Sequence, residues 1–142
     1  MKRIYVNEDW CLGCHLCEYF CTFANSGEKY MPAIKDSPLS TRVRVEEKDK
    51  ITFAVSCRHC VEPHCISACI SGALSKNADG VVSVDKTKCV GCGSCVMMCP
   101  YGAIEISSSH VATKCELCIN NGNGKPACVA HCPNGAIVFE ER

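Results

Sequence analysis

The cysteines are the residues of this sequence best suited to chemistry, sixteen of them in a chain of 142 residues. Thiolates bind soft metals, and a chain this short often needs metals or disulfides to complete its fold. The cysteines fall into four groups of four, with none left over: Cys11, Cys14, Cys17 and Cys21; Cys57, Cys60, Cys65 and Cys69; Cys89, Cys92, Cys95 and Cys99; and Cys115, Cys118, Cys128 and Cys132. The grouping predicts four equivalent metal centres.

The spacing within the groups indicates [4Fe–4S] clusters. In the first and third groups two residues separate the first cysteine from the second and the second from the third. Three residues separate the third cysteine from the fourth. In such a run the fourth cysteine ligates a neighbouring cluster. The second and fourth groups have a longer gap between their second and third cysteines, which reshapes the loop and keeps the ligand set. We therefore predict that all sixteen cysteines bind four [4Fe–4S] clusters through iron, and we predict no catalytic residue.

Disulfides and zinc are the competing explanations for so many cysteines. Residues 1–6 contain no apolar core of an export signal, so we expect a reducing compartment, the cytoplasm, where disulfides are rare. Zinc sites use two Cys-x-x-Cys pairs, whereas the runs here are triplets followed by a fourth cysteine. A zinc-stapled interaction module stays open as the alternative from another class.

Four histidines stand close to cysteines in the sequence, namely His15, His59, His64 and His131. A histidine-ligated cluster of the Rieske kind replaces two cysteines by two histidines. Each group here already has four cysteines, so we expect these histidines to tune the clusters rather than to ligate iron.

The charge of the chain limits the kinds of partner that it can bind. Lysine and arginine together number 15, as do aspartate and glutamate, so the formal net charge is zero. Four oxidised clusters with their thiolates would add roughly −8, which argues against nucleic-acid binding. Arg42, Arg44, Lys88 and Lys114 then compensate this charge or dock a partner, unless they are ordinary solvated surface residues. No apolar run is long enough to cross a bilayer, so we expect no direct membrane insertion.

Short elements are predicted between and after the cysteine groups. Residues 69–74, 99–104 and 132–137 repeat one Cys-x-x-Gly-Ala phrase, which indicates duplication. An Asp-Gly turn at 79–80 predicts a hairpin over 73–85, and a second ribbon is expected from 103–106 and 111–113. Residues 136–140 form a final strand that residues 2–6 could pair with. Helices of one or two turns should begin near 96–98 and 129–131.

Residues 22–56 are the one sizeable interval without cysteine. Its prolines and the alternating pattern at 42–47 predict a loop followed by two strands, over 42–47 and 51–55. The interval either caps the first cluster or docks a partner.

The motifs at residues 57–65, 114–118 and 126–133 resemble signatures of a known family, the four-cluster ferredoxin-like electron-transfer subunits of the dimethyl sulfoxide reductase and formate dehydrogenase type. The resemblance covers nearly the whole chain. Within that family, residues 10–21 followed by 24–27 are most similar to the iron–sulfur subunit associated with carbon monoxide dehydrogenase.

The resemblance implies a fold and a crossed ligand arrangement. The fold is α+β, a duplicated ferredoxin-like dicluster fold with short helices, short antiparallel β-ribbons and many loops. One half, residues 1–25 and 105–142, would hold two clusters, residues 26–51 would be an insertion, and residues 52–104 would form the other half with two clusters. The implied ligand sets are Cys11, Cys14, Cys17 and Cys132; Cys115, Cys118, Cys128 and Cys21; Cys57, Cys60, Cys65 and Cys99; and Cys89, Cys92, Cys95 and Cys69.

Such a chain is expected to relay single electrons rather than to act as an enzyme. The expected partners are a larger redox enzyme of the carbon monoxide dehydrogenase, hydrogenase or formate dehydrogenase type and a second oxidoreductase. No phosphate-binding glycine loop is present, so a flavin or nicotinamide would belong to a partner. A free polyferredoxin serving several enzymes is the alternative within redox function. Exposed clusters should make the protein sensitive to dioxygen.

Overall fold

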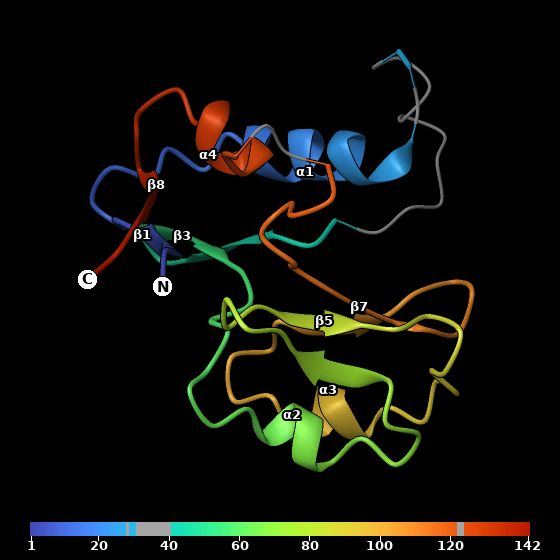
Figure 1. The fold of residues 1–142 in the computed structure, drawn as a ribbon. Helices are drawn as coiled ribbons and strands as arrows, with labels where there is room; N and C mark the ends of the chain where they lie inside the picture. The colour runs from blue at the N-terminus through green and yellow to red at the C-terminus, as the bar shows by residue number, and fades with distance from the viewer. Residues whose placement is uncertain (28, 31–40, 122–123) are drawn as a thin grey trace.

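The structure is a computed structural model that describes residues 1–27, 29–30, 41–121 and 124–142. Its described part consists of short helices and strand pairs joined by loops (Figure 1), which confirms the predicted α+β class. The strands form two-stranded antiparallel sheets: β1 (Arg3–Val6) with β8 (Ile137–Glu140), β2 (Arg44–Lys48) with β3 (Ile51–Val55), β4 (Leu74–Lys76) with β5 (Val82–Val84), and β6 (Ile104–Ile106) with β7 (Ala112–Lys114). The helices are α1 (Leu16–Ser26), α2 (His64–Ser67), α3 (Ser94–Met98) and α4 (Ala127–Ala130).

One layer of the molecule joins the two ends of the chain. Strand β1 pairs with β8, with Ile4 opposite Phe139, and the two termini lie side by side (Figure 1). Helices α1 and α4 pack above this ribbon, where the ring of Phe20 stacks on that of His131 with centroids 3.6 Å apart. The predicted pairing of the chain ends is confirmed.

Helix α1 is longer than the helices of one or two turns that were predicted near 96–98 and 129–131. It has 11 residues and ends at Ser26. The next residue, Gly27, has a φ of 73°, in the left-handed region that glycine adopts readily. The first residues of the interval predicted as a loop, residues 22–26, therefore continue this helix. The two strands predicted after that loop are present as β2 and β3, whereas residues 28 and 31–40 of the loop lie outside the described residues.

The other layer contains α2, α3 and two β-ribbons (Figure 1). In the first ribbon Leu74 lies opposite Val84, and the intervening turn contains Gly80 at φ 82°. In the second ribbon Ile104 lies opposite Lys114. Both predicted hairpins are confirmed. No helix in the described ranges is long and apolar enough to cross a membrane.

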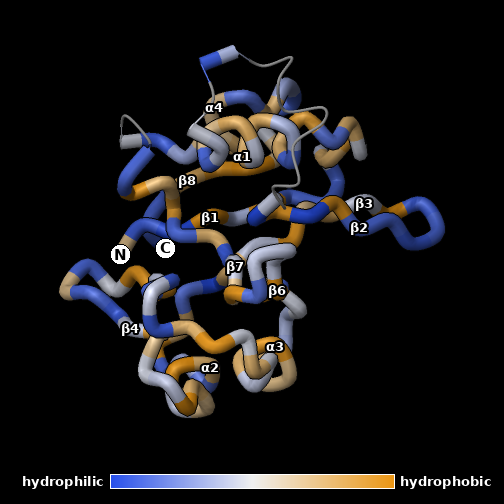
Figure 2. The backbone as a smooth tube through the Cα atoms, turned by 90° about the vertical axis from the view of Figure 1, so that its right-hand side faces the viewer, coloured by the Kyte–Doolittle hydropathy of each residue, from blue (hydrophilic) through white to orange (hydrophobic). Residues whose placement is uncertain are grey.

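Cysteines take positions in both hydrophobic cores. One core, between β1, β8 and the helices α1 and α4, combines Ile4 and Ile137 with buried cysteines. The other, around the ribbons and α3, contains Leu74, Ile104 and Ala112. The second core therefore extends across the boundary predicted between residues 104 and 105. The tube in Figure 2 shows apolar segments in both layers, along β8 near α1 and α4 and along α2 and α3.

Candidate metal centres

Three cavities in the described part of the chain are each lined by four cysteines. In every case three cysteines come from one motif and the fourth comes from another. The sets are Cys11, Cys14, Cys17 and Cys132; Cys57, Cys60, Cys65 and Cys99; and Cys69, Cys89, Cys92 and Cys95.

The remaining four cysteines come from α1, from α4 and from the tract that follows β7. Cys21 lies on α1, Cys128 lies on α4, and both are buried. Cys115 and Cys118 lie in the tract that follows β7, and Cys115 is also buried. Cys21, Cys115 and Cys128 pack in one hydrophobic core, together with Cys17 of another motif. Burial raises the pKa of Cys128, and the charges of Cys115, Cys21, Cys118 and Cys17 add to this rise. Twelve of the sixteen cysteines thus line cavities in fours, and the other four lie near one another.

Sharp backbone bends allow the cysteines of one motif to converge. Gly91 and Gly93, between Cys89 and Cys95, have φ angles of 69° and 77°, which glycine adopts at little cost. Gly91 is also constrained by space, because a Cβ there would lie 2.2 Å from the carbonyl oxygen of His110. The loop therefore packs directly against the turn between β6 and β7.

Backbone N–H groups point at several cysteine sulfurs. A hydrogen bond to sulfur favours the thiolate over the thiol and tunes the potential of a metal bound to it. The donors and acceptors in the described ranges are Arg42 to Cys21 (3.4 Å), His59 to Cys57 (3.4 Å), Ala73 to Cys69 (3.2 Å), Ala112 to Cys89 (3.3 Å) and Leu117 to Cys115 (3.5 Å). These donors fit centres whose ligands are thiolates.

Burial strongly affects the thiols that lie deepest. It raises the pKa of Cys17 and of Cys115 to about 12, so without a metal both thiols hold their protons at neutral pH. The pKa of the exposed Cys92 is lowered instead, chiefly by a hydrogen bond with the Ser94 side chain. A bound metal group would supply the positive charge that replaces the protons of the buried thiols.

The arrangement fits a group larger than one metal ion. Zinc requires sulfur ligands at about 2.3 Å from a single centre. Among the described residues no three His, Cys, Asp or Glu side chains converge closely enough for one ion. Four thiols spaced around a cavity, with donors aimed at their sulfurs, match the donor set of a [4Fe–4S] cluster.

Three of the histidines beside the cysteines contact protein groups. His15 Nδ1 lies 2.7 Å from Glu18 Oε2, and His131 Nδ1 lies 2.9 Å from the Ala127 carbonyl oxygen. His59 is buried, and its Nδ1 accepts a hydrogen bond from Val82 N–H at 3.0 Å. Whether these histidines tune the clusters stays a prediction.

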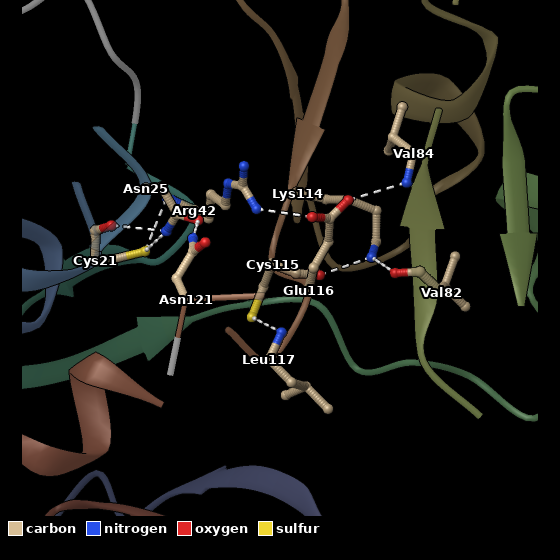
Figure 3. Close-up of polar contacts among 10 residues, drawn as sticks. All are labelled: Cys21, Asn25, Arg42, Val82, Val84, Lys114, Cys115, Glu116, Leu117 and Asn121. Atoms are coloured by element: carbon tan, nitrogen blue, oxygen red, sulfur yellow. Dashed lines mark hydrogen bonds and ion pairs between the residues drawn. The ribbon is translucent and has the colours of Figure 1, made fainter. Parts of the chain in front are cut away.

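Polar residues between the two layers form a network that the sequence did not indicate (Figure 3). Glu116 Oε1 accepts a hydrogen bond from Val84 N–H at 3.0 Å, and its Oε2 pairs with Arg42 at 2.9 Å. The Arg42 N–H in turn points at Cys21. Lys114 is only 1% exposed, so the interpretation of this residue as solvated surface is wrong. Glu116 carried no signal in the sequence beyond its position between two motif cysteines.

Fold and donor set together define a small iron–sulfur protein of the ferredoxin-like kind. Residues 49–142 match the family model described as 4Fe-4S dicluster domain, and the chain belongs to this family.

Similar proteins carry related descriptions. An "Iron-sulfur protein" of Rhodospirillum rubrum is 39% identical over 94% of this chain and 79% of its own length. The "Electron transport protein HydN" of Escherichia coli (strain K12) is 32% identical over 99% of this chain and 89% of its own length. Among solved structures, a chain of the active site complex BamBC of benzoyl coenzyme A reductase matches with a TM-score of 0.53 at 25% identity, covering 100% of this chain and 80% of that chain.

Proposed function

We propose that this chain holds four [4Fe–4S] clusters with crossed ligands. The proposed sets are Cys11, Cys14, Cys17 and Cys132; Cys57, Cys60, Cys65 and Cys99; Cys69, Cys89, Cys92 and Cys95; and Cys21, Cys115, Cys118 and Cys128. The single observation that carries the proposal is a set of three cavities, each lined by three cysteines of one motif and one cysteine of another, which leaves Cys21, Cys115, Cys118 and Cys128 as the fourth set. Each bound cluster would accept and donate one electron at a time.

The four clusters would form two pairs in two halves of the chain. Residues 1–25 with 105–142 would hold one pair, residues 52–104 would hold the other, and residues 26–51 would be an insertion. The cavities support two halves, because those of Cys57, Cys60, Cys65 and Cys99 and of Cys69, Cys89, Cys92 and Cys95 take their cysteines only from residues 52–104. Both hydrophobic cores contain residues of each half, which joins the two halves together. The chain's own contribution is to bury the sulfurs, to aim N–H donors at them, and to hold the two pairs against each other through β5 and residues 114–116.

As a function, we propose a subunit that relays single electrons between a larger redox enzyme and a second oxidoreductase, in the cytoplasm. The enzyme would be of the carbon monoxide dehydrogenase, hydrogenase or formate dehydrogenase type, and any flavin or nicotinamide would belong to a partner. The support is the likeness to an electron transport protein and to a chain within a reductase complex. Sixteen thiols without a disulfide suit a reducing compartment. A free polyferredoxin is the second candidate.

The first experiment counts and assigns the clusters. Anaerobically purified protein should contain about sixteen iron and sixteen sulfide ions per chain. The variant Cys132→Ser should alter the spectroscopic signal of the cluster held by Cys11, Cys14 and Cys17, whereas the matched variant Cys21→Ser should alter the cluster held by Cys115, Cys118 and Cys128. If Cys132→Ser changed the second of these clusters and left the first intact, the crossed arrangement would be wrong. A colourless, iron-free but folded protein would contradict the clusters themselves.

The second experiment identifies the partner. Affinity-tagged protein purified anaerobically from its native cells should bring a larger redox enzyme with it in a fixed ratio. Protein that purifies alone and reduces several unrelated acceptors would instead favour the free carrier.

A further inference from the structure

A buried lysine lies where the two layers meet. Lys114, at the end of β7, is 1% exposed, and its Nζ donates hydrogen bonds to the carbonyl oxygens of Val82 on β5 and, at 2.7 Å, of Cys115 (Figure 3). No carboxylate of the described residues forms an ion pair with it. A buried ammonium without a counter-charge is strongly destabilising, so a negative group is expected nearby.

The neighbouring carboxylate does not serve this purpose. Glu116 lies on the same tract, but its two oxygens accept from Arg42 and from Val84 N–H. The two carbonyl oxygens that accept from Lys114 carry only partial charge. The counter-charge must therefore come from another source.

Lys114 lies close to cysteines of two different sets. Its Nζ donates to the carbonyl oxygen of Cys115, a member of one set. It also donates to the carbonyl oxygen of Val82, and Val82 lines the cavity of Cys57, Cys60, Cys65 and Cys99. In agreement, the Lys114 ammonium lowers the pKa of both Cys65 and Cys115 against the rise caused by burial. Lys114 therefore lies between the set of Cys57, Cys60, Cys65 and Cys99 and the set of Cys21, Cys115, Cys118 and Cys128.

A second buried donor at the same place lacks a partner. His59 is 1% exposed, and its Nδ1 accepts from Val82 N–H, so the ring proton is on Nε2. Nε2 is buried without a hydrogen-bond partner in the described structure. An unsatisfied N–H beside an uncompensated ammonium indicates an acceptor that is negatively charged.

We propose that the Lys114 ammonium is the shared counter-charge of the two [4Fe–4S] clusters at this junction, and that it raises the reduction potential of both. This inference rests on the proposed function. A positive charge in a poorly polarisable interior attracts the electron that arrives on either cluster, so reduction of both becomes more favourable. Because one charge acts on both clusters, its loss should lower both potentials together. Lys114 is thus a positioning residue for electron transfer.

The test compares two lysines that make similar hydrogen bonds. In Lys114→Met the buried charge is lost. The control is Lys76→Met, because Lys76 Nζ also donates to two carbonyl oxygens, those of Cys60 and Val61, at 2.9 Å each, but Lys76 is exposed and its charge is screened by water. The reduction potentials of the individual clusters are measured in the complete protein by redox titration, with electron paramagnetic resonance as the readout. The clusters are assigned with Cys21→Ser and with Cys99→Ser, which removes the proposed fourth ligand of the other junction cluster.

For Lys114→Met we expect the equilibrium constant for reduction of both junction clusters to fall at least tenfold, or about 59 mV for a one-electron couple. The two other clusters and all clusters of Lys76→Met should change less than threefold. Equal small shifts in both variants would overturn the inference while the clusters themselves remain. Wild-type protein without four clusters would instead contradict the proposed function.

A structural failure of the variant is also informative. If Lys114→Met cannot be loaded, Lys114→Gln, which retains amide donors but not the charge, is measured in its place by the same criterion. If neither variant retains the junction clusters while the two others load normally, a charge requirement at this junction is supported. Loss of all four clusters in both variants would mean that Lys114 only supports the fold, and the inference would be wrong.

Discussion

The close approach of Gly91 to the β6–β7 turn leads to a quantitative prediction. Gly91 and Gly93 lie in the same cluster-binding loop, and both have a positive φ. A Cβ at Gly91 would lie 2.2 Å from the carbonyl oxygen and 3.1 Å from the carbonyl carbon of His110, whereas a Cβ at Gly93 would meet nothing within 4 Å. Gly91→Ala and Gly93→Ala therefore share the backbone strain, and only the first adds a steric clash.

The magnitudes follow from these two terms. A left-handed conformation costs an L-residue about 1–2 kcal/mol, and this applies to both variants. The turn cannot easily retreat from a methyl group at position 91, because Ser107 N–H is bonded to the Val111 carbonyl at 2.9 Å and Ala112 N–H points at the Cys89 sulfur. Overpacking of this kind costs about 1–3 kcal/mol more. This extra cost in Gly91→Ala relative to Gly93→Ala corresponds to a factor of roughly 5 to 150 in the equilibrium constant for opening the cluster-binding loop.

The assay measures the rate at which the clusters are lost to a chelator under anaerobic conditions, monitored by the visible absorption of the clusters. Gly91→Ala should release its cluster about 5- to 150-fold faster than Gly93→Ala, and Gly93→Ala should be only modestly faster than wild type. Equal rates for the two variants would refute the reasoning, because the turn at His110 would then move aside without cost.

Three further predictions concern the polar interior. Arg42→Met should lower the free energy of unfolding of the cluster-loaded chain by about 1–3 kcal/mol, because it leaves the Glu116 carboxylate, which is only 16% exposed, without its ion-pair partner. In guanidinium unfolding, the double variant with Glu116→Gln should recover part of this loss, and no recovery would contradict a direct pair. The pKa of His59 is about 3 in the fold against 6.5 when unfolded, so its contribution to stability is complete above pH 6.5 and is lost as the pH falls toward 3. Between these values His59→Gln should reduce the slope of the free energy of unfolding against pH by up to about 1.4 kcal/mol per pH unit, and an unchanged slope would count against a buried neutral ring. Because burial raises the pKa of Cys17 and Cys115 to about 12, reconstitution of the clusters at neutral pH should release protons into weakly buffered solution, and a constant pH would show that these thiols were already ionised.

Local signals explain why the hairpins could be predicted from the sequence. An Asp-Gly turn followed by β-branched residues predicts a hairpin without reference to the rest of the chain, and Gly80 takes the positive φ that this turn requires. The pairing of β1 with β8 is different, since it joins the two ends of the chain. It was predicted because residues 2–6 and 136–140 could both form strands, and because the family resemblance implies ligands shared between the first and the last motif.

The interior charges could not be predicted, because nothing local distinguishes a buried lysine from an exposed one. Lys114 and Lys88 each precede a cysteine that begins a motif, yet Lys88 is exposed and pairs with Asp85, while Lys114 is enclosed by β5 and the tract after β7. The difference arises from the packing of one layer on the other. The length of α1 is an intermediate case, since Gly27 is a recognisable helix end, but the intervening Thr22 and Asn25 weaken the helical signal.

The placement of the cysteines couples the fold to its conduction of electrons. Cys17, Cys21, Cys115 and Cys128 pack in the same core as Ile4 and Ile137, so their sulfurs occupy space that aliphatic side chains would fill in a metal-free protein. Without metal, ionised cysteines would place charges that repel one another in a medium of low polarity. Protonated cysteines would avoid this repulsion, but their small side chains would give the core only weak packing. In the proposed arrangement two clusters meet this core, one through Cys17 and one through Cys21, Cys115 and Cys128. Each cancels most of the charge of its thiolates and fills the space between their sulfurs, which stabilises the core. A change that weakens packing there should therefore also shift a potential, and a change that removes a cluster should also loosen the contact between α1 and α4.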